Sequence, residues 1–211
     1  PSNDFKDILS LVPAVYQNEF NAVITKGTAA FNGFVKGNYS PVSIPAYAVN
    51  LSIKDGYFKY PDLPQPVQDI NLLLKANNVD GRPDNTVVDI PNATMRFGNE
   101  LFTLRLLYKQ PVTAQYIDAG AKGKLDLSTI GQFMKLPEGT KIGGQVIADL
   151  AAKGNLKVVL QQQPGPFQAN GVVQLVNVSY ASKEFPQPVK NTNARIQFSN
   201  PDGKPDNTIV D

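Results

Sequence analysis

The residue types that could carry out chemistry in this chain are few. The chain contains no histidine and no cysteine. Ser–His–Asp and Cys–His catalysis are therefore excluded, and so are zinc sites built from histidine or cysteine ligands. Glu19, Glu138 and Glu184 could supply the carboxylate pair of a glycosidase, but their spacing singles out no pair. We interpret them as scattered surface acids and expect no catalytic residues.

An acidic segment at residues 80–86, with the sequence DGRPDNT, could present oxygen ligands to calcium. The ligands would be Asp80, Asp84 and Asn85. An EF-hand loop, however, needs a regular series of ligands that ends in a glutamate, and this segment lacks that series. A hairpin turn explains the same residues, because glycine tolerates positive φ, proline fixes φ, and Asp and Asn side chains bond to nearby backbone. We predict a turn, with no metal and no cofactor.

The strongest internal signal is a duplication. Residues 64–89 align with residues 186–211 without a gap at an offset of 122 residues, and 14 of the 26 positions are identical. Upstream, the tripeptide Lys-Gly-Asn at residues 36–38 recurs at residues 153–155. The sequence therefore predicts a repeated structural unit.

These matches divide the chain into two units of about 120 residues. We assign residues 1–120 to a first repeat unit, a helix followed by strands, and residues 121–211 to a second. The first copy continues into strand-like sequence beyond Asp89, whereas the second stops at the equivalent Asp211. We expect the second unit to be truncated at its C-terminal end and the chain to be a fragment of a longer repeat protein.

Each unit is expected to begin with a short helix, because apolar residues recur at helical spacing after a capping residue. The first helix would present Phe5, Ile8, Leu9 and Val12 on one face. The second would begin after Asp126 or Ser128, present Leu127, Ile130 and Met134, and end before Pro137.

The remainder of each unit is predicted as strands, because apolar and polar residues alternate with a period of two. The clearest runs are residues 47–54, 70–75 and 101–108. In the second unit, the same alternation predicts that Val172, Val176 and Val178 share a face with Gln174 and Tyr180. The connections are too short for crossover helices. We therefore expect a mainly β fold: a repeated, curved, mostly antiparallel sheet with one short helix per unit.

One apolar face of this sheet is the candidate binding site. A helix of about ten residues covers only about 15 Å, which is too little to cover six or more strands spaced about 4.8 Å apart. The uncovered apolar rows would meet the next unit, a ligand, or a second sheet in a closed sandwich core. The candidate groove residues are Val49, Leu51, Leu72, Leu74, Leu104 and Leu106.

Composition limits the classes of partner. The formal net charge is +2, and the charges are interspersed, so no nucleic-acid partner is expected. No run approaches the roughly 20 apolar residues of a membrane-spanning helix, and no signal peptide opens the chain. We expect any exporting or anchoring segment to lie outside these 211 residues.

An ordered set of short motifs resembles the AsmA-like family. The motifs are Leu125-Asp126-Leu127 with Ile130, Leu136-Pro137-Glu138-Gly139, Gly144, Ala148-Asp149-Leu150, Lys153-Gly154, and the segment from Asp55 to Pro64 with its continuation to Asp89. The resemblance implies a large protein held in the inner membrane by an N-terminal helix, with a β-rich periplasmic body linked to outer-membrane biogenesis. Some relatives resemble bridge-like lipid carriers with an apolar groove along a curved sheet. The family supplies no catalytic motif.

The resemblance implies a non-catalytic structural or lipid-handling segment in the periplasm. Its partners would be phospholipid or other acyl chains and neighbouring repeat units of the longer protein. An extracellular β-repeat adhesin or carbohydrate-binding module is the competing interpretation, because repeated β units with Asn/Asp turns occur there too. Exposed aromatic platforms would favour that alternative, and the absence of tryptophan counts against it. A glycosidase ranks third.

Overall fold

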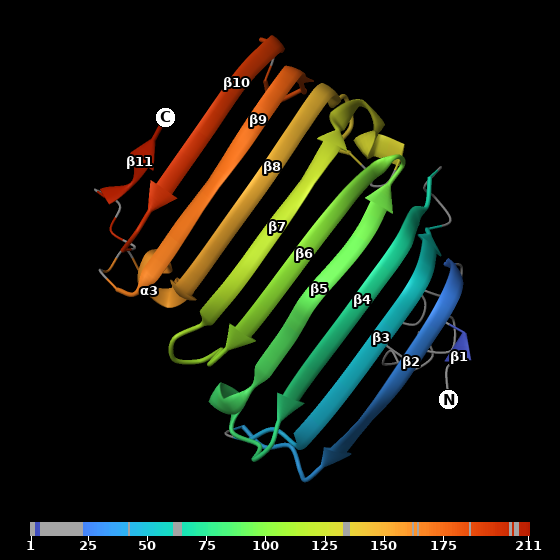
Figure 1. Cartoon of the computed structure of the whole chain (residues 1–211), viewed down its shortest axis with the longest axis vertical. Helices are drawn as coiled ribbons and strands as arrows, with labels where there is room; N and C mark the ends of the chain where they lie inside the picture. Colours follow the sequence, from blue (N-terminus) through green and yellow to red (C-terminus); the bar gives the residue numbers. More distant parts are fainter. Residues whose placement is uncertain are drawn as a thin grey trace.

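The chain forms a single open sheet. The computed structural model describes residues 3–4, 23–41, 43–60, 65–132, 136–161, 163, 165–185, 187–202, 204 and 207–211. These residues form an eleven-stranded sheet in which the strands lie side by side in sequence order (Figure 1). Every neighbouring pair is antiparallel. The prediction of a mainly β, antiparallel fold is confirmed.

The first and last strands, β1 and β11, lie at opposite edges of the sheet (Figure 1). In order, the strands are β1 (Asn3–Asp4), β2 (Ile24–Lys36), β3 (Ala46–Lys59), β4 (Val67–Asn78), β5 (Val87–Phe97), β6 (Glu100–Lys109), β7 (Tyr116–Asp126), β8 (Lys141–Asn155), β9 (Phe167–Ala181), β10 (Val189–Asn200) and β11 (Ile209–Val210).

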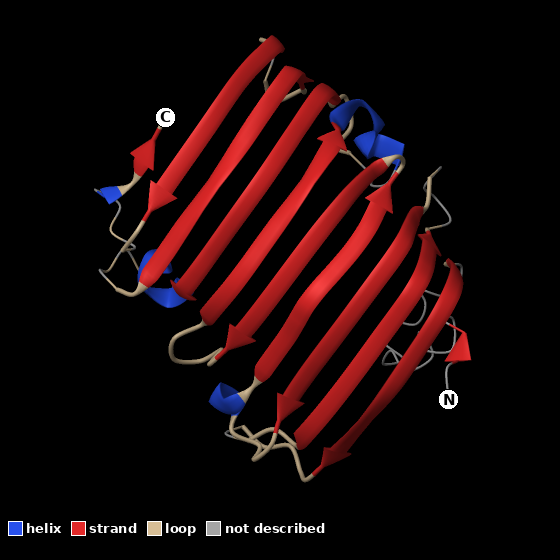
Figure 2. Ribbon diagram, viewed as in Figure 1, coloured by secondary structure: helices blue, strands red, loops and turns tan. Residues whose placement is uncertain are grey.

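The short helical segments among the described residues lie at the ends of strands and not over a face of the sheet (Figure 2). They are the 3-10 helices η1 (Pro83–Asn85) and η2 (Leu127–Gln132) and the α-helix α3 (Leu156–Leu160). η2 lies where the second helix was expected, and the N–H of Ser128 donates to Asp126 Oδ1 at 2.9 Å. Met134 and the helix expected over residues 5–12 lie outside the described residues.

β-Bulges interrupt the alternation in both halves of the chain. Asp55, Asp69, Asn177 and Asn191 have φ values of 50–51°, a left-handed conformation that Asp and Asn tolerate better than most residues. The register of the neighbouring strands shifts beside each of them. Because a bulge inserts one extra residue into a strand, the side chains on its two sides change faces.

The predicted face of the C-terminal part of β9 is wrong for this reason. Leu175 lies opposite Ala194, and Val178 lies opposite Thr192, two residues away along β10. Ala194 and Thr192 are two positions apart and share a face. Val178 and Leu175 therefore also share a face, although they are three positions apart along β9. Val178 and Tyr180 lie on the face of Leu175, and Val172, Gln174 and Val176 lie on the other.

Equivalent hydrogen bonds recur at an offset of 122 residues in the two hairpin turns. The amide of Asn78 donates to the carbonyl oxygen of Arg82 at 2.6 Å and to Thr86 Oγ1 at 3.1 Å. In the later turn, Asn200 donates to the Lys204 carbonyl oxygen at 2.8 Å and to Thr208 Oγ1 at 2.7 Å. The similar residues of the two segments therefore make the same local contacts.

The bulges also make equivalent contacts. The N–H of Asp55 donates to Asn71 Oδ1 at 3.2 Å, and the N–H of Asn177 donates to Asn193 Oδ1 at 2.9 Å. Each of these two asparagines also donates to the carbonyl oxygen of the residue two positions before it. The side chains that hold the bulges are thus the same in both places.

Little of the sheet is fully buried. The buried hydrophobic residues among those described are Val23, Ala29, Ile53 and Ala93. Ala29 and Ile53 form a small cluster against which Leu51, Ile70 and Leu72 pack. Most other apolar side chains of the strands are half-buried or exposed, so apolar surface remains accessible over much of the sheet.

Candidate functional site

The six candidate groove residues lie on one face of the sheet. Leu51 on β3 lies opposite Leu74 on β4, and Val49 lies opposite Ala76 two residues along. The remaining three belong to the same face through the registers of β4, β5 and β6. Leu72 lies opposite Ala93, which lies opposite Leu104, and Leu106 follows two residues later on β6. The structure therefore brings the predicted residues together on adjacent strands.

The apolar face extends well beyond these six residues. A single row of directly opposed residues crosses the sheet from β2 to β11, and we call it the apolar row. Its members are Ala29, Ile53, Leu72, Ala93, Leu104, Ala121, Leu150, Gly171, Phe198 and Val210. A second row runs parallel to it from β5 to β10 through Met95, Phe102, Gly123, Ala148, Val173 and Ile196.

Large side chains on this face fill the space above glycines. A Cβ at Gly123 would lie 2.6 Å from the ring of Phe102, which is directly opposite on β6. A Cβ at Gly171 would lie 2.7 Å from the side chain of Leu150. Phe97 packs edge-on against Phe102, with ring centroids 5.3 Å apart. Cross-strand contacts of this kind pack the face within its own layer.

The apolar row is largely buried in its first part, where Ala29, Ile53 and Ala93 are at most 5% exposed, and it is more accessible from Leu104 onward. Leu104, near its middle, is 38% exposed, and Val210 at its end is 62% exposed. Ile53 and Ala93 are buried, and Leu72 and Leu150 are half-buried. Exposed apolar residues that lie on neighbouring strands of one sheet face typically mark a site for a partner or ligand.

The opposite face carries charged side chains in a ladder across β6, β7 and β8. Asp118 pairs with Arg105 on one side at 2.5 Å and with Lys153 on the other at 3.5 Å. Lys122 pairs with Asp149 at 2.8 Å. The hydrogen bond from Arg105 lowers the pKa of the Asp118 carboxyl, and the one to Asp149 raises the pKa of Lys122. One face of the sheet thus carries paired charges together with the exposed Leu101 and Ile147, and the other carries the apolar row.

The carboxylates of the acidic turn between β4 and β5 already have partners. Asp80 accepts hydrogen bonds from the Arg82 N–H at 3.1 Å and from the Asn85 amide at 2.7 Å. Asp84 accepts from the N–H of Thr113 at 2.9 Å and from its hydroxyl at 2.6 Å. These bonds lower the pKa of both carboxyls. The predicted turn is present, and Asp84 connects it to the β6–β7 turn.

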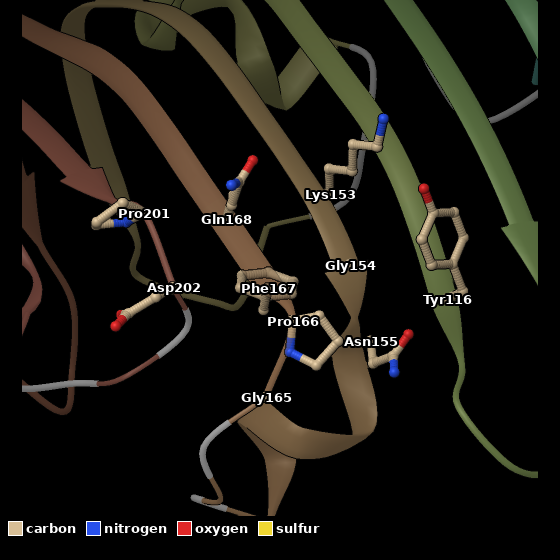
Figure 3. A pocket seen from close by; sticks show the side chains of 10 residues that line it. All are labelled: Tyr116, Lys153, Gly154, Asn155, Gly165, Pro166, Phe167, Gln168, Pro201 and Asp202. Carbon is tan, nitrogen blue, oxygen red and sulfur yellow. The ribbon is translucent and has the colours of Figure 1, made fainter.

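A cavity of about 440 Å³ lies at the ends of β8 and β9, beside α3 (Figure 3). Gly154 allows the Pro166 backbone to approach closely beside this cavity, since a Cβ there would lie 2.0 Å from the carbonyl oxygen of Pro166. Lys153 and Gln168 point to the same side of the sheet in Figure 3, but Lys153 already pairs with Asp118. Asp202 accepts hydrogen bonds within its own turn. Among the described residues that line this cavity, no nucleophilic side chain is hydrogen-bonded to a general base.

The acids considered for a glycosidase are not brought together by any contact of the described residues. Glu138 pairs with Lys183 at 2.9 Å on the surface, and Glu184 is exposed. Glu19 lies outside the described residues.

Comparison with protein-family models, with curated proteins and with solved structures finds no match to the chain. Within the described ranges, no helix has the length and apolarity needed to cross a membrane. The described residues also contain no group of three or more His, Cys, Asp or Glu side chains that could hold a metal ion. The two-faced sheet is therefore the feature from which a function can be argued.

Proposed function

We propose that the chain is a non-catalytic, lipid-handling segment of a periplasmic AsmA-like protein, and that its apolar sheet face shields acyl chains from water. The observation that carries the proposal is the apolar row from Ala29 to Val210. The longer protein is anchored in the inner membrane by an N-terminal helix outside this chain and serves outer-membrane biogenesis or lipid transport.

The dimensions of the row suit an acyl chain. The more accessible part of the row, from Leu104 on β6 to Val210 on β11, crosses six neighbouring strands, and at about 4.8 Å spacing it is roughly 24 Å long. One leaflet of a bilayer contributes about 15 Å of hydrocarbon thickness, so this part is long enough for an acyl chain. Each methylene transferred from water to an apolar environment contributes about 0.8 kcal/mol. An open apolar row therefore favours a flexible hydrocarbon over a polar ligand.

The proposal includes two repeat units of about 120 residues. The recurrent hydrogen bonds of Asn78 and Asn200, and of Asn71 and Asn193, support it. In the longer protein, such units join into a curved sheet with one short helix per unit, and the apolar face lines its groove. The neighbouring units are then partners of this chain, as the acyl chains are.

The test is photo-crosslinking in the cell, in the longer protein. A photoreactive residue is placed at Leu51, Leu74 or Leu104, and in the controls at Asn50 or Lys75. Asn50 and Lys75 are directly opposed on the other face. The expected result is lipid adducts at the three leucine positions and none at the controls. Equal labelling of both faces, or no lipid labelling at all, would rule out the proposal.

A further inference from the structure

Among the described residues, the outer edge of β2 is mostly unpaired. β2 pairs with β3 from Ile24 to Lys36. On its other side, the described residues pair with it at Thr28 and Ala29, through β1. Residues 30–36 are all exposed, including Phe34 at 52% and Val35 at 72%. The sequence of residues 29–36, AAFNGFVK, contains one charged residue and no proline.

Edge strands of soluble proteins are normally protected by charges, prolines, bulges or short length, because their free N–H and C=O groups pair readily with another strand. The 30–36 segment of β2 is long and carries large apolar side chains on both faces. These properties are those of an edge that another strand covers.

The partner can be inferred from β8, which is the counterpart of β2 at an offset of 117 residues. Gly27 on β2 and Gly37 directly after it have φ values of 107° and 108°, and their counterparts Gly144 and Gly154 have 89° and 131°. A Cβ at Gly27 would lie 2.6 Å from the Asp55 carbonyl oxygen, and one at Gly144 would lie 2.4 Å from that of Asn177. Gly27 and Gly144 therefore lie against equivalent bulges, and both strands have positive-φ glycines at equivalent positions near their two ends.

The outer edge of β8 is paired with β7 from Gln145 to Asn155. The short strand β1 occupies the corresponding place on β2. Asp4 of β1 lies opposite Thr28 of β2, and the equivalent pair in the second half is Asp126 opposite Gln145. Asn3 lies opposite Ala29, and the equivalent pair is Leu125 opposite Val146. β1 therefore has the position and direction of the last two residues of a β7-type strand.

We propose that the free edge of β2 is the docking site for a β7-type strand of a neighbouring repeat unit. The inference rests on the repeat units of the proposed function and not on lipid binding. The register follows from β7 and β8. Phe31, Gly33 and Val35 of β2 face counterparts of Gly123, Ala121 and Ala119. Small partner residues leave room for the ring of Phe31, and the apolar face continues past β2 into the neighbouring unit.

The test extends the chain at its N-terminus, in lipid-free buffer. The sequence of residues 116–124, YIDAGAKGK, is placed directly before Asn3 in place of residues 1–2. The matched control carries the same extension with one added glycine before Asn3. A shift of one residue turns every side chain of the added strand to the wrong face. The readout is hydrogen exchange of the backbone amides of residues 30–36.

In the in-register extension, the outward-pointing amides of residues 30–36 are expected to exchange at least about tenfold more slowly than in the control, since protection follows the free energy of local opening. Equal exchange in the two proteins, fast or slow, would overturn the inference.

A second copy of the chain is the other occupant to test. If the unextended chain dimerises and Val35→Lys abolishes both the dimer and any protection of residues 30–36, the edge belongs to a homodimer and the inference is wrong. Loss of lipid binding in other assays leaves this result unchanged.

Discussion

Asn78 at the end of β4 donates a side-chain hydrogen bond to the hydroxyl oxygen of Thr86, just before β5, at 3.1 Å. Asn78 is fully buried. Its side-chain oxygen Oδ1 accepts a hydrogen bond from the N–H of Gly81 at 2.7 Å, and its side-chain Nδ2 donates to the backbone oxygen of Arg82. A single side chain thus satisfies backbone and side-chain groups around the whole hairpin turn.

Replacing Asn78 is therefore expected to destabilise the protein strongly. In Asn78→Ala, the buried N–H of Gly81 loses its acceptor, and leaving such a group unsatisfied costs about 1–3 kcal/mol. The matched control is Asn200→Ala, because Asn200 makes equivalent bonds in the later turn but is only half-buried. Denaturant unfolding measures both. A smaller loss for Asn78→Ala than for Asn200→Ala would contradict this account of the turn.

The acidic residues predict how stability depends on pH. Asp80, Asp84, Asp118 and Asp202 all have pKa values below the ordinary value of 3.8 in the folded protein, chiefly because they accept hydrogen bonds. A carboxyl with a lowered folded pKa stabilises the protein above its unfolded pKa, and that contribution is lost as the pH falls through the folded value.

Stability is accordingly expected to decline as the pH is lowered from about 5 to about 3. Asp84→Asn removes one of the four carboxyls and should make this decline shallower, although the variant is less stable at neutral pH. The measurement is the urea midpoint at several pH values. A steeper decline in Asp84→Asn than in the wild type would show that another group controls the acid transition.

The sequence predicted the parts of the fold that depend on local alternation and on turn residues. The runs around Leu51 and Leu104 show a strict period of two, so their faces could be predicted. The duplicated Asp-Gly turns predicted the hairpins. Asp55 and Asn177 could not be recognised as bulges, because their left-handed conformation depends on contacts with Asn71 and Asn193 on the next strand.

The apolar face of the second half was also missed. β7 carries Ala119, Ala121 and Gly123 on that face, and such small residues give a weak hydrophobic signal. Their contribution becomes visible only once the register places Phe102 over Gly123 and Leu104 beside Ala121. The extent of the apolar row is therefore a property of strand pairing, which a single strand's sequence does not contain.

The packing of Phe102 over Gly123 gives a further prediction. In Gly123→Ala, the new Cβ would lie 2.6 Å from the ring, and overpacking of this kind costs about 1–3 kcal/mol. The control is Gly120→Ala on the same strand, where the nearest atoms belong to the flexible side chain of Arg105 at 2.9 Å and beyond. Denaturant unfolding should show a larger loss for Gly123→Ala.

A double-mutant cycle separates the ring contact from other effects of the new methyl group. In a Phe102→Leu background, Gly123→Ala should be less destabilising than in the wild type, because the ring is absent. An unchanged cost would mean that the strain at residue 123 comes from the backbone and not from Phe102.

The last prediction concerns the two faces of β6. Leu101 and Leu104 lie on the same strand, are 44% and 38% exposed, and point to opposite faces. Leu104 belongs to the apolar row, whereas Leu101 lies opposite Arg96 on the polar face.

If acyl chains bind the apolar row, Leu104→Gln should weaken the binding of a fluorescent phospholipid about tenfold or more, because contacts with two or more methylenes are lost at about 0.8 kcal/mol each. Leu101→Gln should change the dissociation constant by less than about twofold, because Leu101 does not lie on the apolar row. A tenfold change would require about 1.4 kcal/mol. Unfolding curves of both variants show whether the sheet is intact. Equal weakening by the two substitutions in folded proteins would mean that the lipid does not distinguish the faces, and the apolar row would then not be the binding surface.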